Sequence, residues 1–178
     1  MKKIKVLSLV LIVLTVLAIT GVAYAASQAY SARLSGAEEV PPRKTPAKGS
    51  AIFQLSEDET ALSYTVTVSN IENVFAAHIH CGVKHVNGPV GVTLFMGTPG
   101  GGAISGTLAS GTIMAPDLGN GCGWADLADV VAAMNSGNAY VNVHTNDGVA
   151  PTNTGPGDFP GGEIRGQITP ILGGVKSK

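Results

Sequence analysis

The amino-acid sequence predicts an all-β protein, an antiparallel β-sandwich with one short helix. Short runs rich in Val, Ile, Thr and Tyr alternate with polar residues and recur between turn residues. Glycine is abundant, with 24 residues in the chain, whereas aromatic residues make up only 5%. Only one segment has the periodicity of a helix, so the chain lacks the helices that would form a bundle or flank a parallel sheet.

Eight segments have the composition and alternation of strands. They are residues 30–34, 51–55, 62–68, 74–81, 90–96, 104–113, 140–145 and 163–169. Three prolines between residues 38 and 46 exclude a central strand there, because proline cannot donate to a strand ladder. The stretch 146–162 is rich in Asn, Asp, Gly and Pro and is expected to be a long loop. Strands of this length and spacing are typical of a β-sandwich.

The single helix is expected from Trp124 to Asn135. Its apolar residues recur at helical spacing and form one stripe, which we interpret as packing against the sheet: Leu127, Val130, Val131 and Met134. Gly137 can end this helix, because glycine readily adopts the left-handed conformation that follows a last turn.

The first 25 residues have the layout of an export signal. Three lysines near the start, an apolar stretch over residues 6–18 and the small-x-small run Ala23-Tyr24-Ala25 predict cleavage after that run. The alternative is an uncleaved membrane anchor, because apolar character persists almost to Ala26. Cleavage would leave residues 26–178, a single domain of about 150 residues with its own hydrophobic core.

We therefore expect a protein that is secreted, periplasmic or held at the cell surface, with no membrane contact after cleavage. Charged residues are 13% of the chain and the formal net charge is −1. Because no basic patch is present, nucleic acid is not expected as a partner. The sequence also lacks the nucleophile and phosphate-loop motifs of ordinary hydrolases and nucleotide-binding enzymes.

Three of the four histidines are candidates for a metal site: His78, His80 and His144. His78 and His80 share one predicted strand, in which residues two apart point to the same face. His144 ends a distant strand that could bring a third imidazole against this pair. Neutral imidazoles are good ligands for copper and zinc. The alternative is that the rings only form hydrogen bonds across the sheet. His85 is expected in a loop outside the site.

The two cysteines, Cys81 and Cys122, are expected to form a disulfide, as an isolated pair in an oxidising compartment most often does. Such a bridge would stabilise the fold by about 3–4 kcal/mol. The alternative is Cys81 as a copper thiolate beside two histidines. However, Cys81 faces away from His80 in a regular strand, and Cys122 would remain a free thiol. The sequence therefore favours the disulfide.

Four motifs resemble the CHRD (chordin) domain family, in particular its stand-alone exported microbial members. They are residues 34–42 (LSGAEEVPP), 77–82 (AHIHCG), 140–145 (YVNVHT) and 161–167 (GGEIRGQ). They occur in family order over almost all of the predicted mature chain, so residues 26–178 are identified as one CHRD domain. The resemblance implies no settled activity. In animal chordin, growth-factor binding is attributed mainly to other modules.

A weaker resemblance concerns copper-zinc superoxide dismutase, so the expected sandwich is immunoglobulin-like or superoxide dismutase-like. The copper of that enzyme lies on a His-x-His strand pair plus later histidines, which is similar to His78, His80 and His144. Arg165 follows His144 much as the enzyme's substrate-steering arginine follows its last copper ligand. No residues match the zinc site of the enzyme, and a shared architecture is weak ground for function.

Other polar residues have structural interpretations. Glu163 and Arg165 lie two apart in a strand and are expected to form an ion pair or a cross-strand contact. Glu38 and Glu39 are expected to be a solvated pair in a loop. A further group could bind calcium but lacks the spacing of a recognised calcium loop, so we interpret its members as turn formers: Asn146, Asp147, Asn153 and Asp158.

Three hypotheses of function follow. The first is an exported module that binds copper, or zinc as second choice, through the three histidines for storage, sensing or scaffolding. The second is a copper-only superoxide dismutase or related redox enzyme in which Arg165 attracts a small anion. The third is a structural surface protein without metal. Three ligands without a zinc site favour the first hypothesis.

Overall fold

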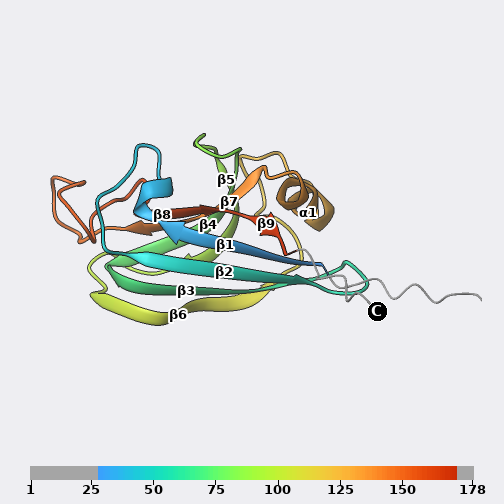
Figure 1. The fold of residues 1–178 in the computed structure, drawn as a ribbon, viewed down its shortest axis with the longest axis horizontal. Coiled ribbons are helices and arrows are strands. Elements are labelled where there is room, and N and C mark those ends of the chain that lie inside the picture. The colour runs from blue at the N-terminus through green and yellow to red at the C-terminus, as the bar shows by residue number, and fades with distance from the viewer. Residues whose placement is uncertain (1–27, 172–178) are drawn as a thin grey trace, which may run out of the picture.

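The structure, a computed structural model, describes residues 28–171, so the predicted export signal over residues 1–25 lies outside the described residues. The elements are, in chain order, β1 (Ala29–Ser35), the 3-10 helix η1 (Gly36–Glu38), β2 (Lys48–Leu55), β3 (Leu62–Glu72), β4 (Val74–Cys81), β5 (Val90–Met96), β6 (Ala103–Ile113), α1 (Leu127–Asn135), β7 (Ala139–Thr145), β8 (Ile164–Gln167) and β9 (Thr169–Pro170). The predicted all-β class with one short helix is confirmed (Figure 1).

The strands form one antiparallel sheet that folds back over itself. Its order is β5-β4-β7-β8-β1-β2-β3-β6, and β9 pairs with β1. The two end strands, β5 and β6, are joined through residues 97–102 and contact each other, so the sheet nearly closes around its core. Figure 1 shows the two halves of this sandwich, with β1, β2, β3 and β6 in one half and β4, β5, β7 and β8 in the other.

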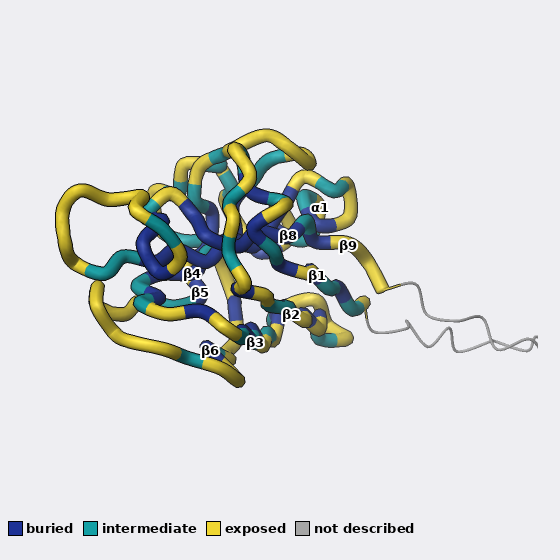
Figure 2. The backbone as a smooth tube through the Cα atoms, turned by 60° about the vertical axis from the view of Figure 1, so that its left-hand side comes forward, coloured by how far each residue is buried: buried dark blue, intermediate teal, exposed yellow. Residues whose placement is uncertain are grey.

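The core lies between the two halves and is built from alternate residues of each strand. Its fully buried side chains include Phe53, Leu62, Val66, Ile79, Val141 and Ile164. In Figure 2 the buried segments lie in the middle of the molecule and exposed loops surround them. Among residues 28–171, no helix is long and apolar enough to cross a membrane.

The helix starts later than predicted. Trp124 precedes it, and Asp126 is the N-cap, whose side chain accepts a hydrogen bond from the backbone N–H of Asp129 at 3.1 Å. The predicted apolar stripe is confirmed, since its members face the core and Val130 and Met134 are fully buried. Gly137 follows the helix with a φ of 70°, in the left-handed region expected of it.

The strand predictions differ from the structure mainly at their ends. β2 begins at Lys48, three residues earlier than expected, and β3 continues to Glu72 because its partners β2 and β6 extend the ladder. The last predicted strand divides in two at Ile168, whose N–H donates to the carbonyl of Ala139 at 3.0 Å. β8 therefore pairs mainly with β7, whereas β9 pairs with β1.

Candidate metal centre

The outer face of β4, β7 and β8 carries polar side chains that loops cover. All seven residues of β7 are buried, so this strand is enclosed on both faces, by the core on one side and by loops on the other. Antiparallel register aligns the polar residues in rows across the strands. One row joins His78, Asn142 and Arg165, and the next joins His80, Tyr140 and Gln167. His144 lies one row beyond Asn142, on the same face.

This register brings the three predicted histidines together. One ligand atom from each of His78, His80 and His144 lies within 4.8 Å of the others. The Nε2 atoms of His80 and His144 are 3.4 Å apart although the residues are 64 positions apart in sequence. Two metal–nitrogen bonds of about 2.05 Å span that distance at a nitrogen–metal–nitrogen angle of about 110°, close to tetrahedral. Two nitrogens bound to one ion can lie at most about 4.1 Å apart. A pair of ligand atoms 4.8 Å apart would therefore have to approach each other by less than about 1 Å to bind the same ion.

Two of the rings are oriented by backbone carbonyls. Nδ1 of His80 lies 2.9 Å from the carbonyl oxygen of Gly88, and Nδ1 of His144 lies 3.0 Å from that of Pro160. A carbonyl oxygen can only accept, so each Nδ1 carries the proton and donates it. In a neutral imidazole the other nitrogen then presents a lone pair. This is the arrangement by which proteins fix the tautomer of a metal-binding histidine.

Burial keeps these rings neutral. Removal from water lowers the pKa of His80 to about 4, and the hydrogen bond to Gly88 opposes this shift only in part. Burial, together with the like charges that His78 and His80 would carry, lowers the pKa of His144 to about 3. Burial also lowers the pKa of His78, against the attraction of Asp117. At neutral pH all three imidazoles therefore have a lone pair available.

The facing Nε2 atoms of His80 and His144 cannot form a hydrogen bond with each other while both rings are neutral. Both are lone-pair acceptors once each Nδ1 donates to a carbonyl, and a hydrogen bond between them would require a further proton. The lowered pKa values of both rings oppose that proton. Two buried lone pairs directed at one point are the environment that a Lewis acid such as a metal ion satisfies.

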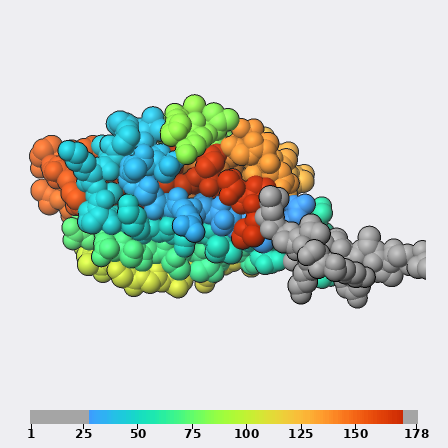
Figure 3. Space-filling view, viewed as in Figure 1, coloured from blue at the N-terminus to red at the C-terminus, as the bar shows by residue number. Residues whose placement is uncertain are grey.

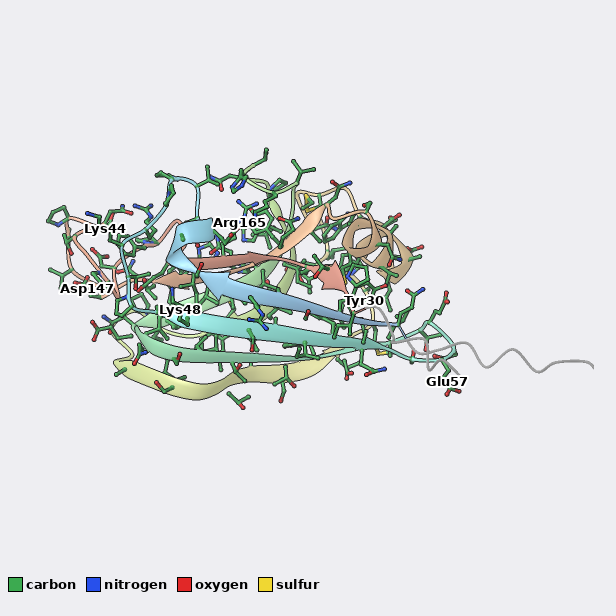
Figure 4. The ribbon with its side chains drawn as sticks, viewed as in Figure 1. Tyr30, Lys44, Lys48, Glu57, Asp147 and Arg165 are labelled. Atoms are coloured by element: carbon green, nitrogen blue, oxygen red, sulfur yellow. A yellow bond between two sulfur atoms is a disulfide. The ribbon has the colours of Figure 1, made fainter. Side chains whose placement is uncertain are left out.

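Arg165 lies beside this cluster but is engaged in other contacts. Its guanidinium carbon is 3.4 Å from the centre of the Tyr140 ring, and the His80 ring stacks on Tyr140 with 5.0 Å between ring centres. Its nitrogens donate to the carbonyls of Val83 and Val86 at 3.1 and 2.9 Å, in the loop after β4. Figure 4 shows Arg165 on β8, and in Figure 3 the green surface of the loop after β4 borders the red surface of the C-terminal strands. With 1% of its surface exposed, Arg165 is a support of the loop and of the Tyr140 ring.

The ion pair between Glu163 and Arg165, one of the two predicted alternatives, is wrong. The other alternative, a cross-strand contact, is confirmed, because Glu163 accepts a hydrogen bond from Thr145 and Arg165 stacks on Tyr140, both on β7. Glu163 is fully buried and accepts hydrogen bonds from the hydroxyls of Thr45 and Thr145 and from the N–H of Gly157. The two side chains share a face, yet each bonds to a different covering loop. Backbone and hydroxyl donors satisfy the carboxylate in place of a cation.

Glu39 was predicted to be solvated, and this is also wrong. Its side chain is only 4% exposed and lies against Gly162 and Asn142, where its Oε1 has no hydrogen-bond partner among the described residues. Burial raises the pKa of Glu39 to about 7, although the positive charges of Arg165 and Arg43 lower it in part. Nothing in the local sequence marks this burial, since the covering contacts come from distant segments.

The predicted disulfide between Cys81 and Cys122 is present, with 5.8 Å between the two Cα atoms. It holds the end of β4, directly after His80, to the loop that precedes the helix. Cys81 is therefore no candidate for a copper thiolate. His85 is exposed in a turn outside the cluster, as expected.

The residues considered for calcium act as turn formers. The side-chain oxygens of Asn146 and Asp147 accept from backbone N–H groups two residues further along, at 2.7 and 2.8 Å. Asn153 adopts a left-handed backbone conformation, and Asp158 accepts from the N–H and hydroxyl of Thr154. These contacts are those of turns and caps.

Fold and site together define an antiparallel β-sandwich with a histidine cluster on its loop-covered outer face. The sequence profile of the CHRD domain matches residues 30–168. Because this match spans most of the chain, the protein belongs to the CHRD domain family, as its motifs predicted. No curated protein and no solved structure matches the chain.

Proposed function

We propose that this protein is an exported module that binds one copper ion through His78, His80 and His144. The observation that carries the proposal is the pair of Nε2 atoms 3.4 Å apart whose Nδ1 atoms are each held by a backbone carbonyl. This geometry directs two lone pairs at one point, and His78 supplies a third nitrogen nearby. A bound ion would remove the repulsion between these acceptors.

Copper is the preferred ion, and zinc is the second choice. Imidazole nitrogen suits both metals, but sites of this ligand type bind Cu(II) more tightly than Zn(II) in the general order of divalent metals. Export is part of the proposal. The signal layout of residues 1–25 supports it, and so does the Cys81–Cys122 disulfide, since such bonds persist mainly outside the cytoplasm.

We do not extend the proposal to superoxide chemistry. That role would require Arg165 to meet a small anion beside the metal, whereas its guanidinium stacks on Tyr140 and donates to the loop after β4. A superoxide assay on copper-loaded protein tests this choice. Turnover that His80→Ala abolishes would restore the enzyme hypothesis.

Calorimetric titration of metal-free protein comprising residues 26–178 tests copper binding. We expect saturation at one copper per chain, with much weaker binding in His80→Ala. His85→Asn is the matched control, because it removes an exposed imidazole and asparagine tolerates the left-handed conformation at that position. Absence of saturable binding, or equal binding by both variants, would overturn the proposal.

A further inference from the structure

The three imidazoles are held unequally, and we infer from this that His78 is the exchangeable ligand through which copper is taken up and released, with Asp117 attracting the incoming ion. This inference rests on the proposed copper function and adds to it. It assigns a direction of access to the site and gives the protein the chemistry of a metal carrier.

His80 and His144 form the fixed part of the site. Each is only 7% exposed, and each Nδ1 donates to a backbone carbonyl in a covering loop. His80 is further held by stacking on Tyr140, with an angle of 12° between the ring planes. Moving either ring off a bound ion would break a part-buried hydrogen bond, and such a loss is costly when the separated groups cannot reach water.

His78 lacks these restraints. It is half-buried, and its Nδ1 has no hydrogen-bond partner among the described residues. Its ring contacts are with His80 and His144, at 5.5 and 5.0 Å between ring centres. Rotation of His78 away from the cluster therefore breaks no hydrogen bond within the described part of the chain. A ligand that no hydrogen bond holds in place is the one that a competing ligand can displace.

On the side away from His144, His78 neighbours β5, the strand at the end of the sheet order. The neighbour of His78 on that strand is the exposed Thr93. The hydroxyl of Thr93 donates to Oδ2 of Asp117 at 2.7 Å, and the N–H of Asp117 donates to the carbonyl of Gly91 at 3.0 Å. These contacts fix a carboxylate beside the exposed Thr93, the β5 neighbour of His78. Its electrostatic effect reaches the ring, since it opposes the lowering of the pKa of His78.

Exchange then proceeds without any change in oxidation state. A nitrogen or oxygen ligand of the acceptor approaches past Thr93 and forms a bond to copper as the bond from His78 breaks. The ion stays on His80 and His144 during this step, and these two bonds break only after the acceptor has supplied its further ligands. Uptake is the reverse sequence, in which the negative charge of Asp117 raises the local concentration of the cation.

Stopped-flow uptake of aqueous Cu(II) by metal-free protein at low ionic strength tests the role of Asp117. Asp117→Asn should slow the association rate by a factor of about 3–10, the effect of one charge close to the path of a divalent ion. The difference should shrink in high salt, because salt screens the attraction between the half-buried Asp117 and an ion approaching through solvent. Glu57→Gln is the matched control. It removes one exposed carboxylate at the β2–β3 turn, far from Arg165 in Figure 4, and should leave the rate unchanged.

Release into EDTA tests the role of His78. In the unaltered protein the release rate should rise with EDTA concentration, because the chelator takes part in the exchange step. His78→Ala should still bind copper through the fixed pair, with affinity lower by about 10–100-fold, as for a perturbed supporting group. Its release should be faster, whereas His80→Ala and His144→Ala should lose much more affinity.

The outcomes separate the two proposals. If the unaltered protein does not bind copper, the proposed function fails. If copper binds but all three histidine variants lose affinity equally, or Asp117→Asn takes up copper at the unaltered rate, only the exchange mechanism fails. Circular dichroism and urea unfolding of each variant confirm that a lost signal does not come from an unfolded chain.

Discussion

Acidification should destabilise the metal-free protein through its buried histidines, and Glu39 should offset part of this effect. His80 and His144 have folded-state pKa values of about 4 and about 3, below the ordinary 6.5. Between pH 6.5 and 4 these rings therefore take up protons in the unfolded chain but not in the folded one. Each ring costs about 1.4 kcal/mol of stability per pH unit, and the two together about 2.7 kcal/mol. His78, whose pKa burial also lowers, acts in the same direction.

Protonation of Glu39 has the opposite effect on the free energy of unfolding. Its pKa is raised from 4.5 to about 7, so between these values the folded protein takes up a proton that the unfolded chain does not. Acidification through this range therefore adds about 1.4 kcal/mol of stability per pH unit. With the rings of His80 and His144 opposed by one carboxyl, and His78 adding to their effect, the free energy of unfolding should fall by at least about 1.4 kcal/mol from pH 6 to pH 5.

Urea unfolding at half-unit steps from pH 7 to pH 5 measures this slope. Glu39→Gln removes the opposing carboxyl and should steepen the loss to at least about 2.7 kcal/mol per pH unit. The reasoning is refuted if stability rises on acidification, or if Glu39→Gln has the slope of the unaltered protein.

Three further predictions concern the groups around the site. Replacing Cys81 and Cys122 together by serine should lower the free energy of unfolding, measured in urea, by about 4 kcal/mol. This is the chain-entropy value for a loop of 41 residues. An unchanged unfolding midpoint would contradict a structural disulfide. Arg165→Lys keeps the charge but loses the planar guanidinium that donates to the carbonyls of both Val83 and Val86. Competition titration should therefore show copper affinity lower by about 10–100-fold. The control is Arg33→Lys, which changes an exposed arginine and should bind copper with unaltered affinity. A methyl group at Gly91 would lie 2.0 Å from the Trp124 ring, so Gly91→Ala should shift the fluorescence of this single tryptophan and cost about 1–3 kcal/mol of stability; an unchanged spectrum would mean that the ring does not cover Gly91.

Local sequence patterns predicted the strands that carry the site because those patterns depend on short-range geometry. The alternation in residues 74–81 requires His78 and His80 to share a face, and β4 has the bounds expected from it. The pairing of Cys81 with Cys122 followed from their number and the predicted compartment. The approach of His144 was a weaker inference, since only the register of β4 with β7 places it beside the pair.

The covering of the outer face could not be predicted in this way. Backbone carbonyls of Gly88 and Pro160 orient the ligand rings, and any residue type at these positions offers a carbonyl. Glu39 and Arg165 look like surface residues by type, yet distant loops bury them both. Long-range closure of loops over a polar sheet face leaves no periodic signal in the sequence, so the site's support was visible only in three dimensions.

In the proposed site, three nitrogens from distant segments of the chain share one copper ion. Electron paramagnetic resonance of metal-free protein loaded with one equivalent of Cu(II) tests this claim most directly, because coupling to nitrogen reports the bound imidazoles. We expect a single copper species with three imidazole nitrogens, and the loss of one nitrogen coupling in His144→Ala while circular dichroism shows an intact sandwich. A spectrum that is identical in the unaltered protein and His144→Ala, or that shows only weakly bound copper in both, would contradict the shared site.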